Sequence, residues 1–305
     1  MLQFLHGTNI PFMKSRKFAY MFSGAMMLAT LAWLVLNGGP RYGVDFTGGT
    51  LLQMRTSREV PADEMRSTLD GVGLTGYELQ QGSGDDRNQY MLRLRSEEKR
   101  DVFATVKQGV ESRFQGVTIE LRSNDVVGPK VGGELRQKAV WAMLTSLGAI
   151  LVFVGIRYEF KFAFGAVVAL FHDVFITLGV LCFFHREMTL TVLAALLTIA
   201  GFSINDTIVI FDRIRERSKE LRKEKHSRVM DIAVNETLSR TVITSLTVFL
   251  TALALFIWGG EVLRDFSLAM LVGVAFGTYS SVFVASALAL DTWIRLDRRK
   301  GITAE

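Results

Sequence analysis

The sequence has a single cysteine, and the familiar catalytic motifs are absent from it. Because Cys182 has no partner, the chain cannot form an internal disulfide, and no cysteine-based zinc site is expected. The G-x-x-x-x-G-K-[ST] loop of ATPases, the H-E-x-x-H zinc motif and the G-x-S-x-G nucleophile turn are also missing. The sequence therefore predicts no enzymatic activity, no metal and no cofactor.

Charged residues are scarce inside the hydrophobic runs, although 49% of the 305 residues are hydrophobic and the net charge is +5. A positive charge could suggest nucleic acid as a partner. Here, however, the Lys and Arg residues lie between and beside hydrophobic runs, where they set membrane topology and contact anionic lipid. We therefore predict a membrane protein that contacts anionic lipid and binds no nucleic acid.

Six hydrophobic runs are long enough to cross a hydrocarbon core of about 30 Å as helices. Helix is the expected state because every backbone amide in lipid must be bonded within its own segment. The first run follows Lys14, Arg16 and Lys17 and is full length, so it is predicted to be a retained helix rather than a cleaved signal. The runs are 18–38, 139–156, 162–184, 188–211, 241–260 and 266–290.

Orientation follows from the Lys and Arg residues of the short connections, which are enriched on the cytoplasmic side. The basic segments all fall on one side of a six-span chain, whereas the opposite short loops hold only Arg186 and Arg264. Both termini are therefore predicted to be cytoplasmic, with an exported insertion. The predicted parts are a cytoplasmic N-terminus (1–17), helix 1 (18–38), a periplasmic domain (39–137), helices 2–6 (138–290) with a charged helical loop (212–238), and a cytoplasmic tail (291–305).

The exported insertion has the pattern of a small α+β domain. Its predicted order, β-α-β-β-α-β, is that of the ferredoxin-like fold. Ser96 is predicted to cap the second helix, which runs to about Phe114. The other elements are strands at Tyr42–Arg55, Tyr77–Gln81, Gln89–Arg95 and Val117–Arg122, a helix at Pro61–Gly71 and a turn at 82–85.

Polar residues inside the spans are the candidates for function, because each is costly in a bilayer. The third span holds His172 and Asp173 near its midpoint. The fourth span holds Ser203, Asn205, Asp206 and Thr207, and the fifth begins with Arg240, followed by Thr244, Thr247 and Thr251.

The four polar residues of the fifth span are spaced i, i+4, i+7 and i+11, which places them on one helix face. That face is expected to meet the bundle interior or a hydrated path. Asp206 lies at a similar depth, so a pair between Asp206 and Arg240 is geometrically plausible. Burial favours the neutral form of a carboxylate and a nearby Arg favours its charged form, so moving the partner would load or release a proton.

Each candidate also has a structural explanation. Asp206 could cap a helix or bond hydroxyl groups, and Arg240 could extend to lipid headgroups. His172 and Asp173 could hold spans together, and the threonines could stabilise the packing of neighbouring helices. Gly273-x-x-x-Gly277 in the last span predicts close helix packing. An intramembrane aspartyl protease is disfavoured, because neither His172-Asp173 nor Asn205-Asp206 lies in a Gly-rich context.

Several motifs together resemble the SecF family of bacterial protein-export membrane subunits. The resemblance covers nearly the whole chain and includes the six-span layout. The segments that carry it are Val44-Asp45-Phe46-Thr47-Gly48-Gly49, Phe171-His172-Asp173, Gly201-Phe202-Ser203-Ile204-Asn205-Asp206-Thr207, Phe211-Asp212-Arg213-Ile214-Arg215-Glu216, Glu236-Thr237-Leu238-Ser239-Arg240-Thr241 and Phe266-Ser267-Leu268.

This resemblance implies a member of the resistance-nodulation-division superfamily in the bacterial inner membrane. It implies a partner half, SecD, and joint action with the SecYEG channel and YajC on an unfolded polypeptide, after the SecA ATPase has started the crossing. The proton motive force would drive the late steps. The implied proton path comprises Asp206, Arg240, Thr244 and Asn205, with His172, Asp173, Thr247 and Ser203 as polar support, and Asp45, Phe46, Gly48 and Gly49 would form the base of the exported domain.

Two other functions remain open at this point. The first is a proton-coupled exporter of small molecules or lipids with the same architecture, although a domain of about 100 residues leaves little room for a deep apolar pocket. The second is a structural scaffold whose buried charges only lock the helices together.

Overall fold

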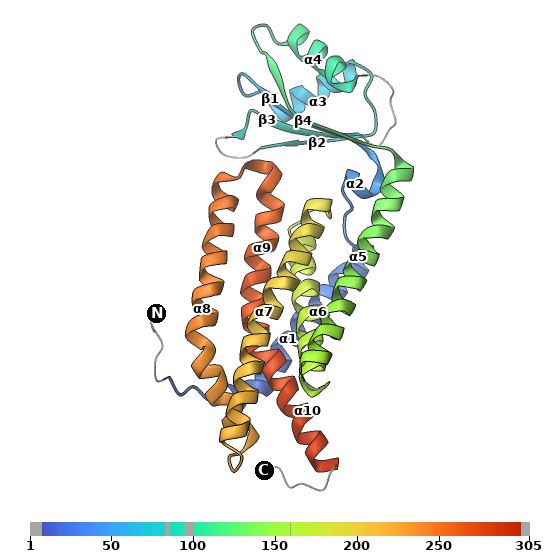
Figure 1. Cartoon of the computed structure of the whole chain (residues 1–305). Coiled ribbons are helices and arrows are strands. Elements are labelled where there is room, and N and C mark those ends of the chain that lie inside the picture. The colour runs from blue at the N-terminus through green and yellow to red at the C-terminus, as the bar shows by residue number, and fades with distance from the viewer. Residues whose placement is uncertain (1–7, 83–85, 95–100, 159, 300–305) are drawn as a thin grey trace. The chain divides into compact units, whose positions relative to one another are not determined.

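The computed structural model describes residues 8–82, 86–94, 101–158 and 160–299. The chain divides into two compact units, each described below by itself (Figure 1). One unit is helical and consists of residues 1–41 and 141–305. The other consists of residues 42–140 and contains the strands.

Among the described residues, six helical segments are long and apolar enough to cross a membrane, which confirms the predicted number. The last crossing segment, Leu263–Arg299, is built from α9, a π-helical turn η3 and α10. The helices are η1 (Phe12–Ser15), α1 (Arg16–Leu36), α5 (Pro129–Arg157), α6 (Phe160–Phe183), α7 (Leu190–Glu220), α8 (His226–Trp258), α9 (Gly260–Ser280), η3 (Ser281–Ala285) and α10 (Ser286–Arg299).

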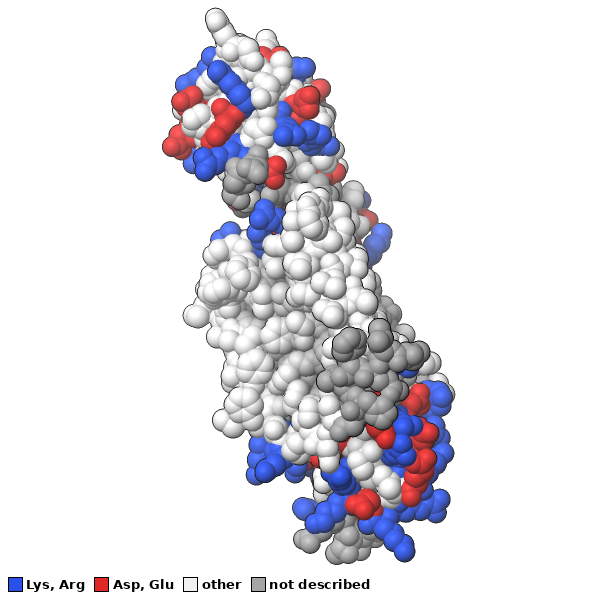
Figure 2. Space-filling model, turned by 90° about the vertical axis from the view of Figure 1, so that its left-hand side faces the viewer, with Lys and Arg blue, Asp and Glu red and all other residues white. Residues whose placement is uncertain are grey.

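The charged stretch 212–238 is not a separate loop helix. It consists of the last turns of α7 and the first turns of α8, joined by residues 221–225. Glu236 accepts hydrogen bonds from Arg213 Nε at 2.6 Å and from Arg217 Nη2 at 2.6 Å, so an ion-pair cluster fastens the two helices together. Figure 2 shows charged side chains gathered at this end of the helical unit, beside a broad band without charge.

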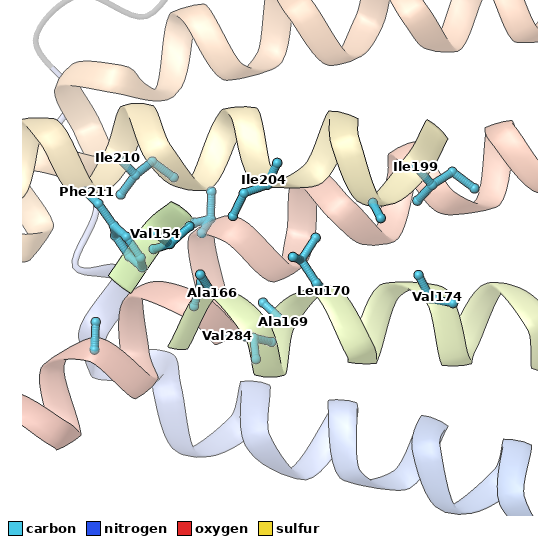
Figure 3. Close-up of a cluster of buried hydrophobic side chains, with 14 of the residues drawn as sticks. Val154, Ala166, Ala169, Leu170, Val174, Ile199, Ile204, Ile210, Phe211 and Val284 are labelled. Carbon is cyan, nitrogen blue, oxygen red and sulfur yellow. The ribbon is translucent and has the colours of Figure 1, made fainter. Parts of the chain in front are cut away.

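The core of the helical unit lies among α6, α7 and α9. In each crossing segment that contains one of these helices, between 50% and 61% of the apolar stretch is buried. In the segments of α1, α5 and α8, the buried share is only 6% to 17%. Small residues such as Ala166 and Ala169 let the backbones approach closely, as is usual between membrane helices (Figure 3). Three helices therefore form the centre, and the other three keep wide apolar faces open.

The N-terminal segment is tied to the start of α8. Asn235 accepts a hydrogen bond from the Ile10 amide at 3.0 Å and donates one to the Ile10 carbonyl at 2.9 Å. Asp231 accepts from the Met13 amide at 2.8 Å. Arg16 forms an ion pair with Asp291 of α10, at 3.3 Å, so the beginning and the end of the helical unit meet at one end of the bundle.

The small unit is a four-stranded antiparallel sheet with the order β2-β3-β1-β4. Alternate residues of the central strands face its buried core, for example Leu52 opposite Leu92, and Val106 and Val110 of α4 pack into the same core. Its elements are α2 (Val44–Thr47), β1 (Gly49–Thr56), α3 (Ala62–Gly71), β2 (Tyr77–Gln81), β3 (Gln89–Leu94), α4 (Val102–Arg113) and β4 (Ile119–Val127).

The predicted strand Tyr42–Arg55 is wrong in its first half. Residues 44–47 form the single helical turn α2, and β1 begins only at Gly49. The change of direction uses positive φ angles of 75° at Gly48 and 127° at Gly49, which L side chains rarely adopt. Alternation of apolar residues cannot reveal such a turn, but the adjacent glycines could have.

The predicted start of the second domain helix also needs correction. Helix α4 begins at Val102 and is capped by Asp101, whose side chain accepts a hydrogen bond from the Ala104 amide at 3.1 Å. The predicted cap, Ser96, and most of the predicted 82–85 turn lie outside the described residues.

Candidate functional site

Asp206 is buried in the helical unit, with 2% of its surface exposed. Its carboxylate accepts hydrogen bonds from two α8 hydroxyl groups, Thr244 Oγ1 at 3.4 Å and Ser245 Oγ at 3.3 Å. Ser245 in turn accepts from Thr278 of α9 at 2.7 Å. Two hydroxyl groups of α8 thus hold this carboxylate, directly supported by one of α9, which is the bonding to hydroxyl groups that the structural explanation of Asp206 expected.

The other predicted members of the proton path are not enclosed by this chain. Asn205 and Arg240 are exposed, and Thr244 is half-buried. Thr247, predicted as polar support, and Thr251 are exposed as well. Within the described residues, no ion pair joins Arg240 to Asp206. The stripe was expected to meet the bundle interior or a hydrated path, and it does not lie in the interior of the described part of this chain, because α8 packs through a different side. The stripe borders the open side of α8, next to the buried Asp206.

The side of α8 that does pack inward carries its own polar residues. Thr237, Thr241 and Ser245 are spaced i, i+4 and i+8, and all three are buried. Thr237 donates to backbone carbonyls of its own helix. The hydroxyl of Thr241 is buried without a partner, among the described residues, which leaves its hydrogen-bonding capacity unused.

A second buried carboxylate, Asp173, lies between α6, α7 and α9 and has no exposed surface. Its Oδ1 contacts His172 Nδ1 at 2.9 Å. Its Oδ2 accepts hydrogen bonds from Ser203 Oγ at 2.6 Å and Ser280 Oγ at 2.7 Å. The other ring nitrogen of His172, Nε2, contacts Ser23 of α1 at 3.1 Å. The structure thus brings His172, Asp173 and Ser203 together as one network.

Four consecutive α9 and η3 residues were missed by the sequence reasoning, although each reaches a different helix. Thr278 contacts Ser245 of α8, Tyr279 contacts Ser23 of α1, Ser280 contacts Asp173 of α6, and Ser281 contacts Thr207 of α7. We call Thr278–Ser281 the hydroxyl hub. Four successive hydroxyl residues in an apolar run were a visible signal for it.

The hub ends where the backbone leaves regular α-helix. Residues Ser281–Ala285 form a π-helical turn, and Ser286 Oγ donates to the Ser281 carbonyl at 2.9 Å. Such turns occur often at functional sites. The predicted close packing at the glycine pair is present as well, because a Cβ atom on Gly273 would lie 2.3 Å from Ile199 Cδ1, and one on Gly277 would lie 3.2 Å from Ser203 Cβ.

The predicted base motif of the small unit lies where α2 meets β1. Phe46 is buried, and Asp45 is half-buried. The start of α5 packs tightly on this turn, because a Cβ atom on Gly132 would lie 2.8 Å from the Gly48 amide nitrogen. Gly132 therefore has no room for a side chain, while Gly48 and Gly49 provide the positive φ angles of the turn.

No group of three or more His, Cys, Asp or Glu side chains with metal-binding geometry occurs in the described part of the chain. The carboxylates of Asp206 and Asp173 meet hydroxyl groups and, for Asp173, the His172 imidazole, and the buried carboxylate of Asp231 meets a backbone amide.

Comparison with known proteins shows to which family the chain belongs. The family profile "Protein export membrane protein SecD/SecF, C-terminal" matches residues 106–295, and the "SecD/SecF GG Motif" matches residues 33–60. The chain belongs to the SecD/SecF family. The match to the GG motif spans residues 33–60, which include Gly48 and Gly49.

Curated relatives place the chain beside SecF within this family. It is 41% identical to the protein translocase subunit SecF of Haemophilus influenzae, over 95% of this chain and 90% of the relative. It is 39% identical to the protein translocase subunit SecF of Rhodothermus marinus, over 98% of both chains. These relatives are named as translocase subunits, a transport role, and a transport role in the membrane agrees with the six apolar helices.

Solved structures of SecDF share the fold. The crystal structure of SecDF from Thermus, titled a translocon-associated membrane protein, has a TM-score of 0.84 and 34% identity. The match covers 95% of this chain but only 39% of that SecDF chain. A SecDF structure in a super-membrane-facing form gives a TM-score of 0.71 at 36% identity. The chain therefore spans well under half of the SecDF proteins that it matches.

Proposed function

We propose that this chain is the SecF half of an accessory complex of the Sec translocase, which uses the proton motive force to promote late steps of polypeptide export. The observation that carries the proposal is Asp206, a buried carboxylate beside the open polar side of α8. A charge that crosses the whole membrane potential supplies about 2.3 kcal/mol per 100 mV. A carboxylate that changes its proton occupancy can couple that energy to helix movement.

SecD is the proposed partner half. The exposed stripe of Arg240, Thr247 and Thr251 would face lipid in a lone chain, which is unfavourable for polar groups. A second, related half would cover it and bring its own groups to Asp206. The SecDF chains, of which this chain spans about 39% or 40%, agree with such an arrangement.

The wider assembly follows from the family resemblance. We propose that the complex acts with the SecYEG channel and YajC on unfolded polypeptide, after SecA has started the crossing. The basic end of the bundle would contact anionic lipid of the bacterial inner membrane. With both termini cytoplasmic, residues 39–137 would be periplasmic, as the positions of Lys and Arg favour.

For the small unit we propose the ferredoxin-like arrangement. Its order β1-α3-β2-β3-α4-β4 and its sheet order β2-β3-β1-β4 support that assignment. The added turn α2 precedes this pattern and joins it to the GG motif. The alternative of a small-molecule or lipid exporter gains no support from relatives named as translocase subunits.

The test is export of a precursor protein into inner-membrane vesicles, with the proton gradient intact or collapsed. With native protein, collapse of the gradient should slow export. With Asp206→Asn or Arg240→Met, export should be slow in both conditions, although the complex assembles at normal levels. Glu216→Gln is the matched control, because it removes an exposed carboxylate from the same helix.

Normal gradient-dependent export by Asp206→Asn would contradict the proposal and favour a scaffold role for the buried charges. Failure of the variant to accumulate would be detected by its membrane level, and Arg240→Met, at an exposed position, then provides the test.

A further inference from the structure

We propose that His172 and Asp173 form a second proton-binding site, separate from Asp206, and that the Ser23 hydroxyl changes from donating to His172 to donating to Tyr279 when this site is loaded with a proton. The proposal rests on the proposed function only in taking the proton as the coupling ion. It starts from the contacts of His172 Nδ1 with Asp173 at 2.9 Å and of His172 Nε2 with Ser23 at 3.1 Å.

The network continues past Ser23 to a backbone acceptor. Ser23 Oγ lies 3.2 Å from Tyr279 Oη, and Tyr279 donates to the Ala19 carbonyl at 3.1 Å. Each hydroxyl has one proton to donate and can also accept. Each contact in the row from Asp173 through His172, Ser23 and Tyr279 to Ala19 therefore joins a possible donor to a possible acceptor, and only the last one, from Tyr279 to the Ala19 carbonyl, has a fixed direction.

The unloaded site carries one negative charge on Asp173. Three donors satisfy that charge, namely His172 Nδ1–H and the hydroxyls of Ser203 and Ser280. The neutral Nε2 of His172 then accepts a hydrogen bond from Ser23, and Tyr279 donates to Ser23 or to Ala19. No group in this state is left without a partner.

The loaded site holds one more proton and is neutral overall. The added proton is on His172 Nε2, so Nε2–H now donates to Ser23, while the proton already present stays between His172 Nδ1 and Asp173 Oδ1. Ser23 can no longer donate to the ring, so it donates to Tyr279, and Tyr279 donates to Ala19. Every group is again satisfied, so the network accommodates both proton counts without an orphaned buried atom.

This reversal links the proton count to helix contacts. Ser23 belongs to α1, Tyr279 to the hydroxyl hub of α9, and Ser280 of the same hub contacts Asp173. Loading therefore changes the bonds that join α1 to α6 and α9. Because Asp173 and His172 have at most 1% exposed surface, proton exchange requires movement of a covering helix, and α1, which contacts His172 through Ser23 and has a largely open outer face, is the element suited to it.

The other ionisable groups around the site are accounted for. Helix α6 packs against α1, α7, α9, η3 and α10. Arg16 and Tyr20 of α1, seven and three residues before Ser23, both contact Asp291 of α10. On α7 the nearest ionisable residue to Ser203 is Asp206, which contacts α8 instead, and η3 has none.

The test follows the proton on His172 Nε2 by nitrogen NMR of the full chain in lipid nanodiscs, with ¹⁵N-labelled histidine. The chain has four histidines, so His172→Gln identifies the signal. Between about pH 5 and about pH 9, a range that brackets ordinary histidine titration, Nε2 should lose its proton in the native chain. In Asp173→Asn, the Nε2 signal should no longer change with pH.

Two further variants sharpen the test. Tyr279→Phe removes the acceptor that only the loaded state needs, so a smaller fraction of His172 should carry the Nε2 proton at a given pH. Thr177→Val is the matched control, because Thr177 is a buried α6 hydroxyl that donates to the Asp173 backbone carbonyl and lies outside the network. It should titrate like the native chain.

An Nε2 signal that does not change with pH in the native chain would overturn the proposal. So would native-like titration in Asp173→Asn, or equal loss of titration in Thr177→Val and Asp173→Asn. The measurement needs neither a gradient nor a partner. A negative NMR result would not contradict the proposed role of Asp206. A negative export result would not contradict this second site.

Discussion

Thr278 of α9 donates a hydrogen bond to Ser245 of α8 at 2.7 Å, and this contact connects the hydroxyl hub to the Asp206 carboxylate. Ser245 in turn donates a hydrogen bond to Asp206 Oδ2 at 3.3 Å, so it links Thr278 to the carboxylate. Through Ser280 the same hub reaches Asp173. Neighbouring residues of one helix thus contact the surroundings of both buried carboxylates, which gives a physical link between them.

Two of the three inward hydroxyls of α8, those of Thr241 and Ser245, are expected to respond oppositely to removal. Thr241→Val should leave stability unchanged or raise it by about 1 kcal/mol, because it replaces a buried hydroxyl without a protein partner by an apolar group of the same shape. Ser245→Ala should lower stability by about 1 kcal/mol, because Thr278 and Asp206 each lose a partner. Thermal unfolding in detergent measures both. A clear loss of stability in Thr241→Val would instead indicate a bound water at that hydroxyl.

Close packing of α9 on α7 predicts that Gly273→Ala is destabilising. The added Cβ would lie 2.3 Å from Ile199 Cδ1, so the helices must separate or Ile199 must leave its position. Overpacking of this kind costs about 1–3 kcal/mol, measurable as a lower unfolding temperature.

Gly148→Ala in α5 is the control for that substitution. A Cβ atom there meets nothing within 4 Å, so the change should be neutral or stabilise the helix by about 0.5 kcal/mol. Equal effects of the two substitutions would show that helix propensity, rather than packing, decides the result.

The phenol of Tyr77 in the small unit should ionise at a higher pH than an ordinary tyrosine. Burial, followed by the hydrogen bond to Asp70 at 2.7 Å, raises the pKa of Tyr77 to about 12. Because the folded pKa exceeds the ordinary value of 10.0, the protonated phenol contributes stability below pH 10.0, and that contribution is lost as the pH rises towards 12. Phenolate absorbance as a function of pH measures the transition.

Asp70→Asn should lower the pKa of Tyr77 but leave it above the ordinary value, because the effect of burial remains. Asp63→Asn is the control, since Asp63 is an exposed carboxylate of the same helix that pairs with Arg66. If Asp70→Asn left the titration of Tyr77 unchanged, the hydrogen bond would not be a cause of the shift.

The open side of α8 is expected to tolerate bulk in the isolated chain but not in the complex. Thr251→Trp should leave the unfolding temperature of the chain unchanged, because Thr251 is exposed. Association with SecD should weaken about tenfold or more, since a steric clash that costs about 1.4 kcal/mol already gives that factor. Co-purification at a series of protein concentrations measures it.

Phe153→Trp, at an exposed position of α5, is the matched control and should associate normally. Unchanged association of the Thr251 variant would place the partner surface elsewhere on the helical unit.

Much of the fold could be predicted because the bilayer leaves a chain few choices. An apolar run of about twenty residues must be a helix, so the six crossing segments followed from hydropathy. The helices extend beyond the runs, as α7 and α8 show, because their charged turns are held by ion pairs such as Arg217 with Glu236. Those pairs join residues that are distant in sequence, so hydropathy does not mark them.

The sequence by itself determined which polar residues are costly in the membrane, including Asp206 and Asp173, because that cost depends only on residue type and position within a span. Only the tertiary structure decided which of their neighbours bond to them. On α8 the inward side is set by contacts with α7 and α9, so Thr241 and Ser245 are buried, while Arg240 and Thr247 are exposed. Helical periodicity identifies a face, but the rotation of that face towards its neighbours depends on packing.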